Sequence, residues 1–108
     1  MSWDIILGKP LPGASCDLFD ERALEEFDLL TVQNSLRAVC PCITEVSSLW
    51  MRYDESSFEI EFDLAEDFIM LHVHILEQSG EKRFLTLLGK ICEKLQCRAW
   101  DTGGGFLF

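Results

Sequence analysis

Positive charge is scarce in this sequence. Lys and Arg together number nine, against 19 Asp and Glu, and the formal net charge is −10. Such a deficit disfavours nucleic acid and anionic membrane surfaces as partners and favours basic proteins or cations. No apolar run approaches the roughly eighteen residues of a membrane span, and the Met-Ser-Trp-Asp start has neither region of a secretory signal. We therefore expect a cytoplasmic protein that binds neither nucleic acid nor membrane.

Signatures of catalysis are also missing. The sequence has no G-x-S-x-G nucleophile motif, and the Gly103-Gly104-Gly105 triplet has no helix after it to bind phosphate. The carboxylates described below are too numerous and too regularly spaced along a strand for the paired acid and base of a glycosidase. We expect no enzyme and no cofactor.

Cysteine is present, but not in a pattern that a metal or a disulfide framework requires. Five cysteines leave at least one unpaired, which favours free thiols in a reducing compartment. Cys40 and Cys42 form a C-x-C pair, and Cys92 and Cys97 lie further along, without the C-x2-C knuckles of a four-thiolate zinc site. Free thiols, buried or half-buried, are the preferred interpretation, and a redox role for Cys40 and Cys42 stays open because it depends on their thiolate pKa.

The remaining pattern predicts one α+β domain over residues 1–108. Three segments rich in apolar and aromatic residues read as strands, and their short connections imply an antiparallel meander: Val46–Tyr53, Ser57–Leu64 and Phe68–Leu76. Apolar residues at helical spacing predict a helix over Glu81–Gln96, and a shorter helix capped by Thr31 ends before Pro41. We expect a two-layer sandwich, with helices packed on one face of the meander and the other face open.

The two ends of the chain are less regular. Trp3–Leu7 reads as a brief first strand or an ordered arm, and Asp17–Asp28 as a helical turn or two or a covering loop. After the second helix, Cys97–Asp101 can return as a strand, Thr102–Gly105 can turn, and Phe106–Phe108 can form a last short strand.

The functional prediction depends mainly on the stretch from Asp54 to Asp67. It holds seven carboxylates and no Lys or Arg: Asp54, Glu55, Glu59, Glu61, Asp63, Glu66 and Asp67. Strand side chains alternate, so Phe58, Ile60 and Phe62 should pack inward while Glu59, Glu61 and Asp63 face outward. Such a row repels itself, and either solvent or a positively charged partner must neutralise it.

Aromatic residues are the usual anchors of protein interfaces, and the strand before the acidic stretch supplies two. Trp50 and Tyr53 point to opposite faces by parity, so at most one of them should be exposed. We take Trp50 and the seven carboxylates as the candidate partner-binding residues.

A second interpretation concerns His72 and His74. Alternation places both imidazoles on one face of the third strand, opposite Ile69, Leu71, Val73 and Ile75, which should face the core. The two could share a metal if a carboxylate on a neighbouring strand, Glu59, Glu61 or Asp63, supplied a third ligand. An H-x-H pair on a partly exposed face can also form only local hydrogen bonds.

From Leu49 onward the chain resembles the small single-domain bacterial immunity proteins that are encoded beside polymorphic toxins. The resemblance covers residues 49–108 and lies in the order of elements: Trp50-Met51-Arg52-Tyr53, Phe58–Phe62, Phe68–Leu76, Phe84–Leu95 and Trp100-Asp101-Thr102-Gly103 closing on Phe106–Phe108. It implies a cytoplasmic protein that binds and blocks a basic toxin domain, such as a nuclease. Binding surfaces differ among such proteins, so no contact residue is carried over.

Three functional hypotheses follow. The chain is an acidic protein-binding module, most consistent with an immunity-type inhibitor; or a metal-binding protein that uses His72 and His74; or a structural or homo-oligomeric subunit. The sequence leaves the oligomeric state open between monomer and homodimer.

Overall fold

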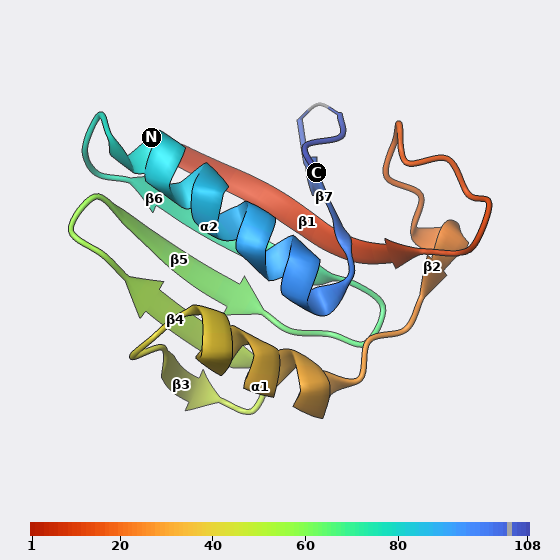
Figure 1. The fold of residues 1–108 in the computed structure, drawn as a ribbon, viewed down its shortest axis with the longest axis horizontal. Coiled ribbons are helices and arrows are strands. Elements are labelled where there is room, and N and C mark those ends of the chain that lie inside the picture. Colours follow the sequence, from red (N-terminus) through yellow and green to blue (C-terminus); the bar gives the residue numbers. More distant parts are fainter. Residues whose placement is uncertain (104) are drawn as a thin grey trace.

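The computed structural model describes residues 1–103 and 105–108, and within them one antiparallel sheet of seven strands is covered by two α-helices (Figure 1). The helices are α1, Leu29–Val39, and α2, Gly80–Leu95; Glu21–Ala23 form a 3₁₀ turn, η1. The strands are β1 Ser2–Pro10, β2 Leu24–Glu25, β3 Thr44–Ser47, β4 Trp50–Asp54, β5 Phe58–Asp63, β6 Ile69–Ile75 and β7 Arg98–Asp101. This arrangement confirms the predicted α+β class.

The sheet runs in the order β2-β1-β6-β5-β4-β3, so β3 to β6 form the expected meander and β1 adds to its far side. β7 pairs with the middle of β1, from Ile5 to Gly8, and β2 pairs with its end at Lys9 and Pro10. No helix among the described residues is long and apolar enough to cross a membrane.

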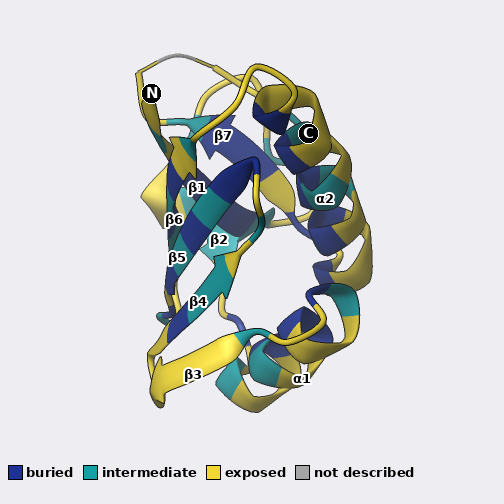
Figure 2. Cartoon of the chain, turned by 90° about the vertical axis from the view of Figure 1, so that its left-hand side faces the viewer, coloured by how far each residue is buried: buried dark blue, intermediate teal, exposed yellow. Residues whose placement is uncertain are grey.

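Both helices lie on the same face of the sheet, and the main core fills the space between the two layers (Figure 2). The inward side chains of β5 and β6 are completely buried, as their alternation predicts: Phe58, Ile60, Phe62, Ile69, Leu71 and Val73. Ile75, at the end of β6, is only half-buried. From α2, Phe84 packs edge-on against both Phe58 of β5 and Trp3 of β1, which joins the helix to the two strands that flank β6.

The predicted strand Val46–Tyr53 is wrong as a single element. The chain reverses at Ser48 and Leu49, so that β3 and β4 form a hairpin with a bulge between Glu45 and Ser47. Ser47 and Ser48 interrupt the apolar residues at the turn, where the Leu49 amide donates to the Ser47 hydroxyl at 3.4 Å. Helix α1 also begins earlier than predicted, because Asp28 rather than Thr31 caps it by accepting a hydrogen bond from the Leu30 amide at 3.2 Å.

The N-terminal strand is longer than the predicted arm. β1 continues through Gly8 to Pro10 because its partners β6, β7 and β2 together supply pairing along its whole length. Asp17–Asp28 contains one helical turn, η1, as one of the two predicted alternatives has it, and also the short strand β2, which was not predicted. At the other end, Phe106 makes a single bridge to Trp100 instead of a strand, and the predicted Thr102–Gly105 turn includes Gly104, which lies outside the described residues.

The sheet face opposite the helices is not uniformly open. At one end of it Trp100 is only 1% exposed, because Phe19 and Phe106 pack edge-on against its ring and its indole N–H donates to the Cys16 carbonyl at 2.8 Å. Phe19 also packs against Phe68. The segment between β1 and β2 therefore closes this end with a small second core, and only the remainder of the face can meet a partner.

Candidate protein-binding face

The open part of the sheet carries one continuous set of polar side chains. Cross-strand pairing places Glu59 opposite Asp54 and His74, and Glu61 opposite Arg52 and His72. On the far side of β6, His72 is paired with Asp4 of β1. Paired residues share a face of a sheet, which defines a polar face made of Asp4, Arg52, Asp54, Glu59, Glu61, Asp63, His72 and His74.

Arg52 lies within the acidic row. Its Nε donates to Asp54 at 3.0 and 3.1 Å, and its terminal nitrogens lie 3.2 Å from Glu61 and 3.3 Å from Glu59. The hydrogen bond to Asp54, with the charges of all three carboxylates, raises the pKa of the guanidinium. The sequence pattern does not single out Arg52, because the cation precedes the acidic stretch and joins it only through the β4–β5 register.

His72 bridges the other carboxylates of the face. Its Nδ1 lies 2.9 Å from Asp4 and its Nε2 lies 2.8 Å from Asp63. Ionised carboxylates only accept hydrogen bonds, so both contacts are made together when both ring nitrogens carry protons. The hydrogen bond to Asp4, together with the one to Asp63, raises the pKa of His72 above its usual 6.5. His72 is therefore biased towards the positively charged imidazolium.

The polar face stays strongly negative in spite of these two groups. Its five carboxylates, on Asp4, Asp54, Glu59, Glu61 and Asp63, face one guanidinium, which leaves four negative charges, or three when His72 is protonated. Arg52, His72, His74, Glu59 and Glu61 surround a shallow hollow of about 90 Å³ at the centre. Each carboxylate of the face keeps more than a third of its side chain exposed. The face is ordered by internal ion pairs and still accessible.

Trp50 lies at the edge of this face. It is paired with Asp63 across β4 and β5, and 39% of it is exposed. Tyr53 projects to the other side, as parity predicts, and packs against Phe58. Burial, with the hydrogen bond to Glu55 at 3.1 Å, raises the pKa of Tyr53 to about 12.

Three of the predicted carboxylates do not belong to the polar face. Glu55 accepts from the Tyr53 hydroxyl and borders a groove against α2. Glu66 and Asp67 lie in the loop between β5 and β6, where the Glu66 carbonyl accepts from the Phe27 amide at 2.6 Å. The seven carboxylates therefore divide among three places, since the side chains follow the strand only as far as Asp63.

The structure places the carboxylates of the metal hypothesis, Glu59, Glu61 and Asp63, on the same face as His72 and His74, but not around a common metal position. Among residues 1–103 and 105–108, no group of three or more His, Cys, Asp or Glu side chains is arranged to hold a metal ion. Both ring nitrogens of His72 face carboxylates, and the Nε2 of His74 lies 3.3 Å from the Ser2 hydroxyl. Local hydrogen bonding accounts for both imidazoles.

All five cysteines are free. Burial raises the pKa of Cys40 to about 12, so this thiol is a poor nucleophile, while its neighbour Cys42 is exposed. The C-x-C pair therefore has no activated thiolate at Cys40.

Comparisons with protein families and curated proteins assign no family to this chain. Neither a scan against protein-family models nor a search of curated proteins gives a match.

Proposed function

We propose that this chain is a protein-binding module whose polar face docks a basic protein, and that it acts as an immunity-type inhibitor of a basic toxin domain such as a nuclease. The observation that carries the proposal is the gathering of five carboxylates on an accessible sheet face beside the exposed Trp50. A flat sheet face is a rigid platform, since each strand of it is held by two neighbours and backed by the core.

Charge supports a basic partner. A surface with three or four net negative charges, depending on the proton of His72, attracts cationic protein over a distance of about one Debye length, roughly 8 Å at physiological salt. Complementary charge of this kind raises the association rate and fixes the orientation of the partner more than it adds affinity. The ion pairs of Arg52 hold Asp54, Glu59 and Glu61 in place before binding, which lowers the entropy lost when a partner docks.

Apolar contact can be supplied by the edge of the same face. Trp50 follows the β3–β4 turn, shares the face of Asp63 and is 39% exposed. An exposed tryptophan beside a charged region matches the composition of interface hot spots. By contrast, two polar faces of like charge would repel each other, so a homodimer through this face is disfavoured.

Binding kinetics test the proposal. The protein encoded by the neighbouring reading frame is the partner to test, and binding is measured by surface plasmon resonance from about 50 to 500 mM salt. The triple variant Glu59→Gln, Glu61→Gln, Asp63→Asn should lower the association rate about tenfold at low salt. Trp50→Ala should mainly accelerate dissociation, at a cost of about 2 kcal/mol in affinity.

The matched control removes the same number of charges elsewhere. The control residues are exposed carboxylates away from the polar face: Glu21, and Glu81 and Glu93 on α2. Replacing all three by Gln should change the association rate by less than about threefold at the same salt. Equal effects of the two triple variants would show that only total charge matters. Binding that does not weaken with salt, or no binding at all, would reject the electrostatic docking mode.

A further inference from the structure

The end of helix α2 places two thiols side by side. Gln96 adopts left-handed backbone angles, φ 52° and ψ 49°, and its amide donates to the Glu93 carbonyl at 3.3 Å while the Cys97 amide donates to the Cys92 carbonyl at 3.0 Å. These two hydrogen bonds define a Schellman motif, in which the side chains at the two ends of the longer bond come into contact. In this chain both of those side chains are cysteines.

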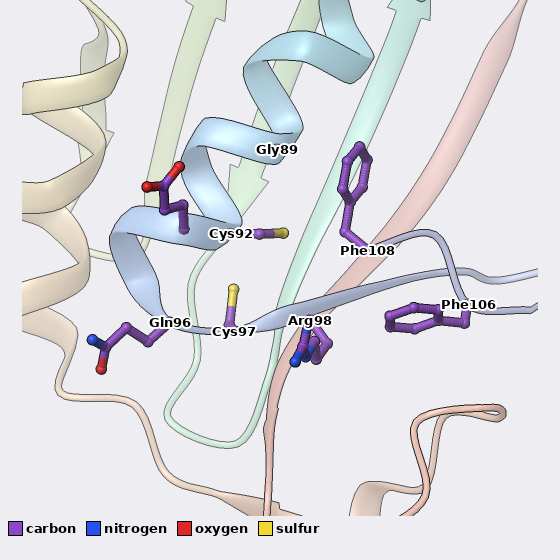
Figure 3. A pocket seen from close by; sticks show the side chains of 8 residues that line it. Gly89, Cys92, Gln96, Cys97, Arg98, Phe106 and Phe108 are labelled. Atoms are coloured by element: carbon purple, nitrogen blue, oxygen red, sulfur yellow. The ribbon is translucent and has the colours of Figure 1, made fainter.

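The pair lies at the base of a pocket of about 610 Å³ between α2, β7 and the last residues of the chain (Figure 3). The other residues that line it are Gly89, Glu93, Gln96, Arg98, Phe106 and Phe108. Figure 3 shows the Cys92 sulfur directed into the pocket and the Cys97 sulfur directed towards α2. Both residues are buried in the fold, at 6% and 5% exposure, but both line the pocket.

The environment makes the two thiols chemically unequal. Hydrogen bonding from the Cys97 thiol lowers the pKa of Cys92, and the positive charge of Arg98 acts in the same direction. The same hydrogen bond, together with burial, raises the pKa of Cys97. A thiolate that forms first at Cys92, beside a protonated thiol, is the arrangement of an attacking and a resolving cysteine.

We propose that Cys92 and Cys97 are a site of reversible oxidation, at which a small disulfide such as glutathione disulfide converts the two thiols into an intramolecular disulfide. The Cys92 thiolate attacks one sulfur of glutathione disulfide, forming a mixed disulfide and releasing one glutathione thiolate. The Cys97 thiol then gives its proton to that thiolate and attacks the Cys92 sulfur, which releases the second glutathione. The protein loses two electrons and two protons, and the small disulfide becomes two thiols.

Three observations favour this pair as the oxidised one. A disulfide needs Cα atoms within about 7 Å, and the direct backbone hydrogen bond between the two residues keeps them adjacent. The pocket admits a small molecule to the attacking sulfur, and Arg98 on its wall can pair with a glutathione carboxylate. The C-x-C pair is less suited to attack a disulfide, because burial raises the pKa of Cys40 to about 12.

Oxidation of the folded protein in a series of glutathione buffers tests the site. After acid quenching, unfolding and alkylation of free thiols, peptide mass spectrometry should find a Cys92–Cys97 crosslink that reducing buffer reverses. Cys97→Ser should instead retain one glutathione on Cys92, since the resolving thiol is absent, and Cys92→Ser should leave Cys97 unmodified. Circular dichroism confirms that each variant is folded.

Exposed Cys42 is the internal control for the oxidant, because its access does not depend on the pocket. The proposal is overturned if Cys42 becomes glutathionylated while Cys92 and Cys97 stay reduced in the folded wild type. It is equally overturned if Cys97→Ser takes up no glutathione at Cys92, or if the crosslink joins other cysteines. None of these results depends on a protein partner, so they test the thiol site separately from the docking face.

Discussion

The first turn of helix α2 is packed so closely against the start of β5 that a single methyl group should disturb it. A Cβ atom placed on Gly80 would lie 2.1 Å from the main-chain oxygen of Ser57, and a real Cβ needs about 3.0 Å. Gly80→Ala therefore requires that the helix and the strand separate by about 0.9 Å. The contacting atom belongs to the backbone, so no side-chain rotation can relieve the clash.

The cost follows from what the Ser57 carbonyl does. It accepts the amides of Leu76 at 2.9 Å and Glu77 at 3.3 Å, and a displacement of this size weakens both hydrogen bonds, which contribute about 1 kcal/mol each. Overpacking of a fixed backbone adds about 1 to 3 kcal/mol. We expect Gly80→Ala to lower the free energy of unfolding by about 3 kcal/mol, or roughly 12 to 24 °C in Tm for a chain of this size.

Gly89→Ala is the matched control in the same helix. Its Cβ would lie 3.3 Å from the ring of Phe108, which is a side chain and can shift by a few tenths of an ångström. Alanine also gains up to about 1 kcal/mol over glycine inside a helix, so the net change should stay within about 1 kcal/mol. Urea unfolding followed by tryptophan fluorescence measures both variants. Equal stability of Gly80→Ala and the wild type would refute the close approach of α2 to β5.

Three further predictions use the same unfolding assay. The Ser57 hydroxyl is buried without a hydrogen-bond partner among the described residues, so Ser57→Ala should raise the free energy of unfolding by about 1 kcal/mol, and a decrease would contradict this. Trp100→Phe should lower it by about 1 to 2 kcal/mol, because the Cys16 carbonyl loses its donor; full stability would show that this bond is dispensable. His72 has a folded pKa above its unfolded value of about 6.5, so its stabilisation is complete below that pH and fades as the pH rises through the folded pKa; His72→Asn should remove this dependence.

The elements that could be predicted from the sequence are those in which apolar residues recur at a regular spacing throughout the element. The six-residue alternation of β5 and the apolar spacing of α2 specify their own inward faces, and both elements lie where expected. The hairpin at Ser48 and Leu49 was missed, because its only turn residues are Ser47 and Ser48, a weaker turn signal than Gly, Pro, Asn or Asp. The length of β1 depends on pairing with β6, β7 and β2, which are distant in sequence.

The candidate site also has residues whose placement the sequence predicts and residues whose placement depends on contacts between distant segments. Outward placement of Glu59, Glu61 and Asp63 follows from alternation within one strand, and the structure places them so. The contributions of Arg52 and Asp4 depend on register between strands, which a single sequence does not state. The adjacency of Cys92 and Cys97 depends on one left-handed residue, Gln96, whose side chain is not among those that usually signal such a helix end.

The proton on His72 acts in opposite directions on the fold and on the proposed docking. With the proton bound, His72 pairs with both Asp4 and Asp63 and supports the sheet. Without it, the polar face is one charge more negative, and one of the two carboxylates loses its hydrogen bond and is free for a cationic partner, because neutral imidazole keeps a single N–H. If a basic protein docks here, its association rate should rise with pH through the folded pKa of His72, while the stabilisation from His72 falls. Association rates measured between about pH 5.5 and 8.5 for wild type and His72→Asn test this, because titration of the partner contributes equally to both proteins. The same pH profile for both proteins would place the partner on another surface.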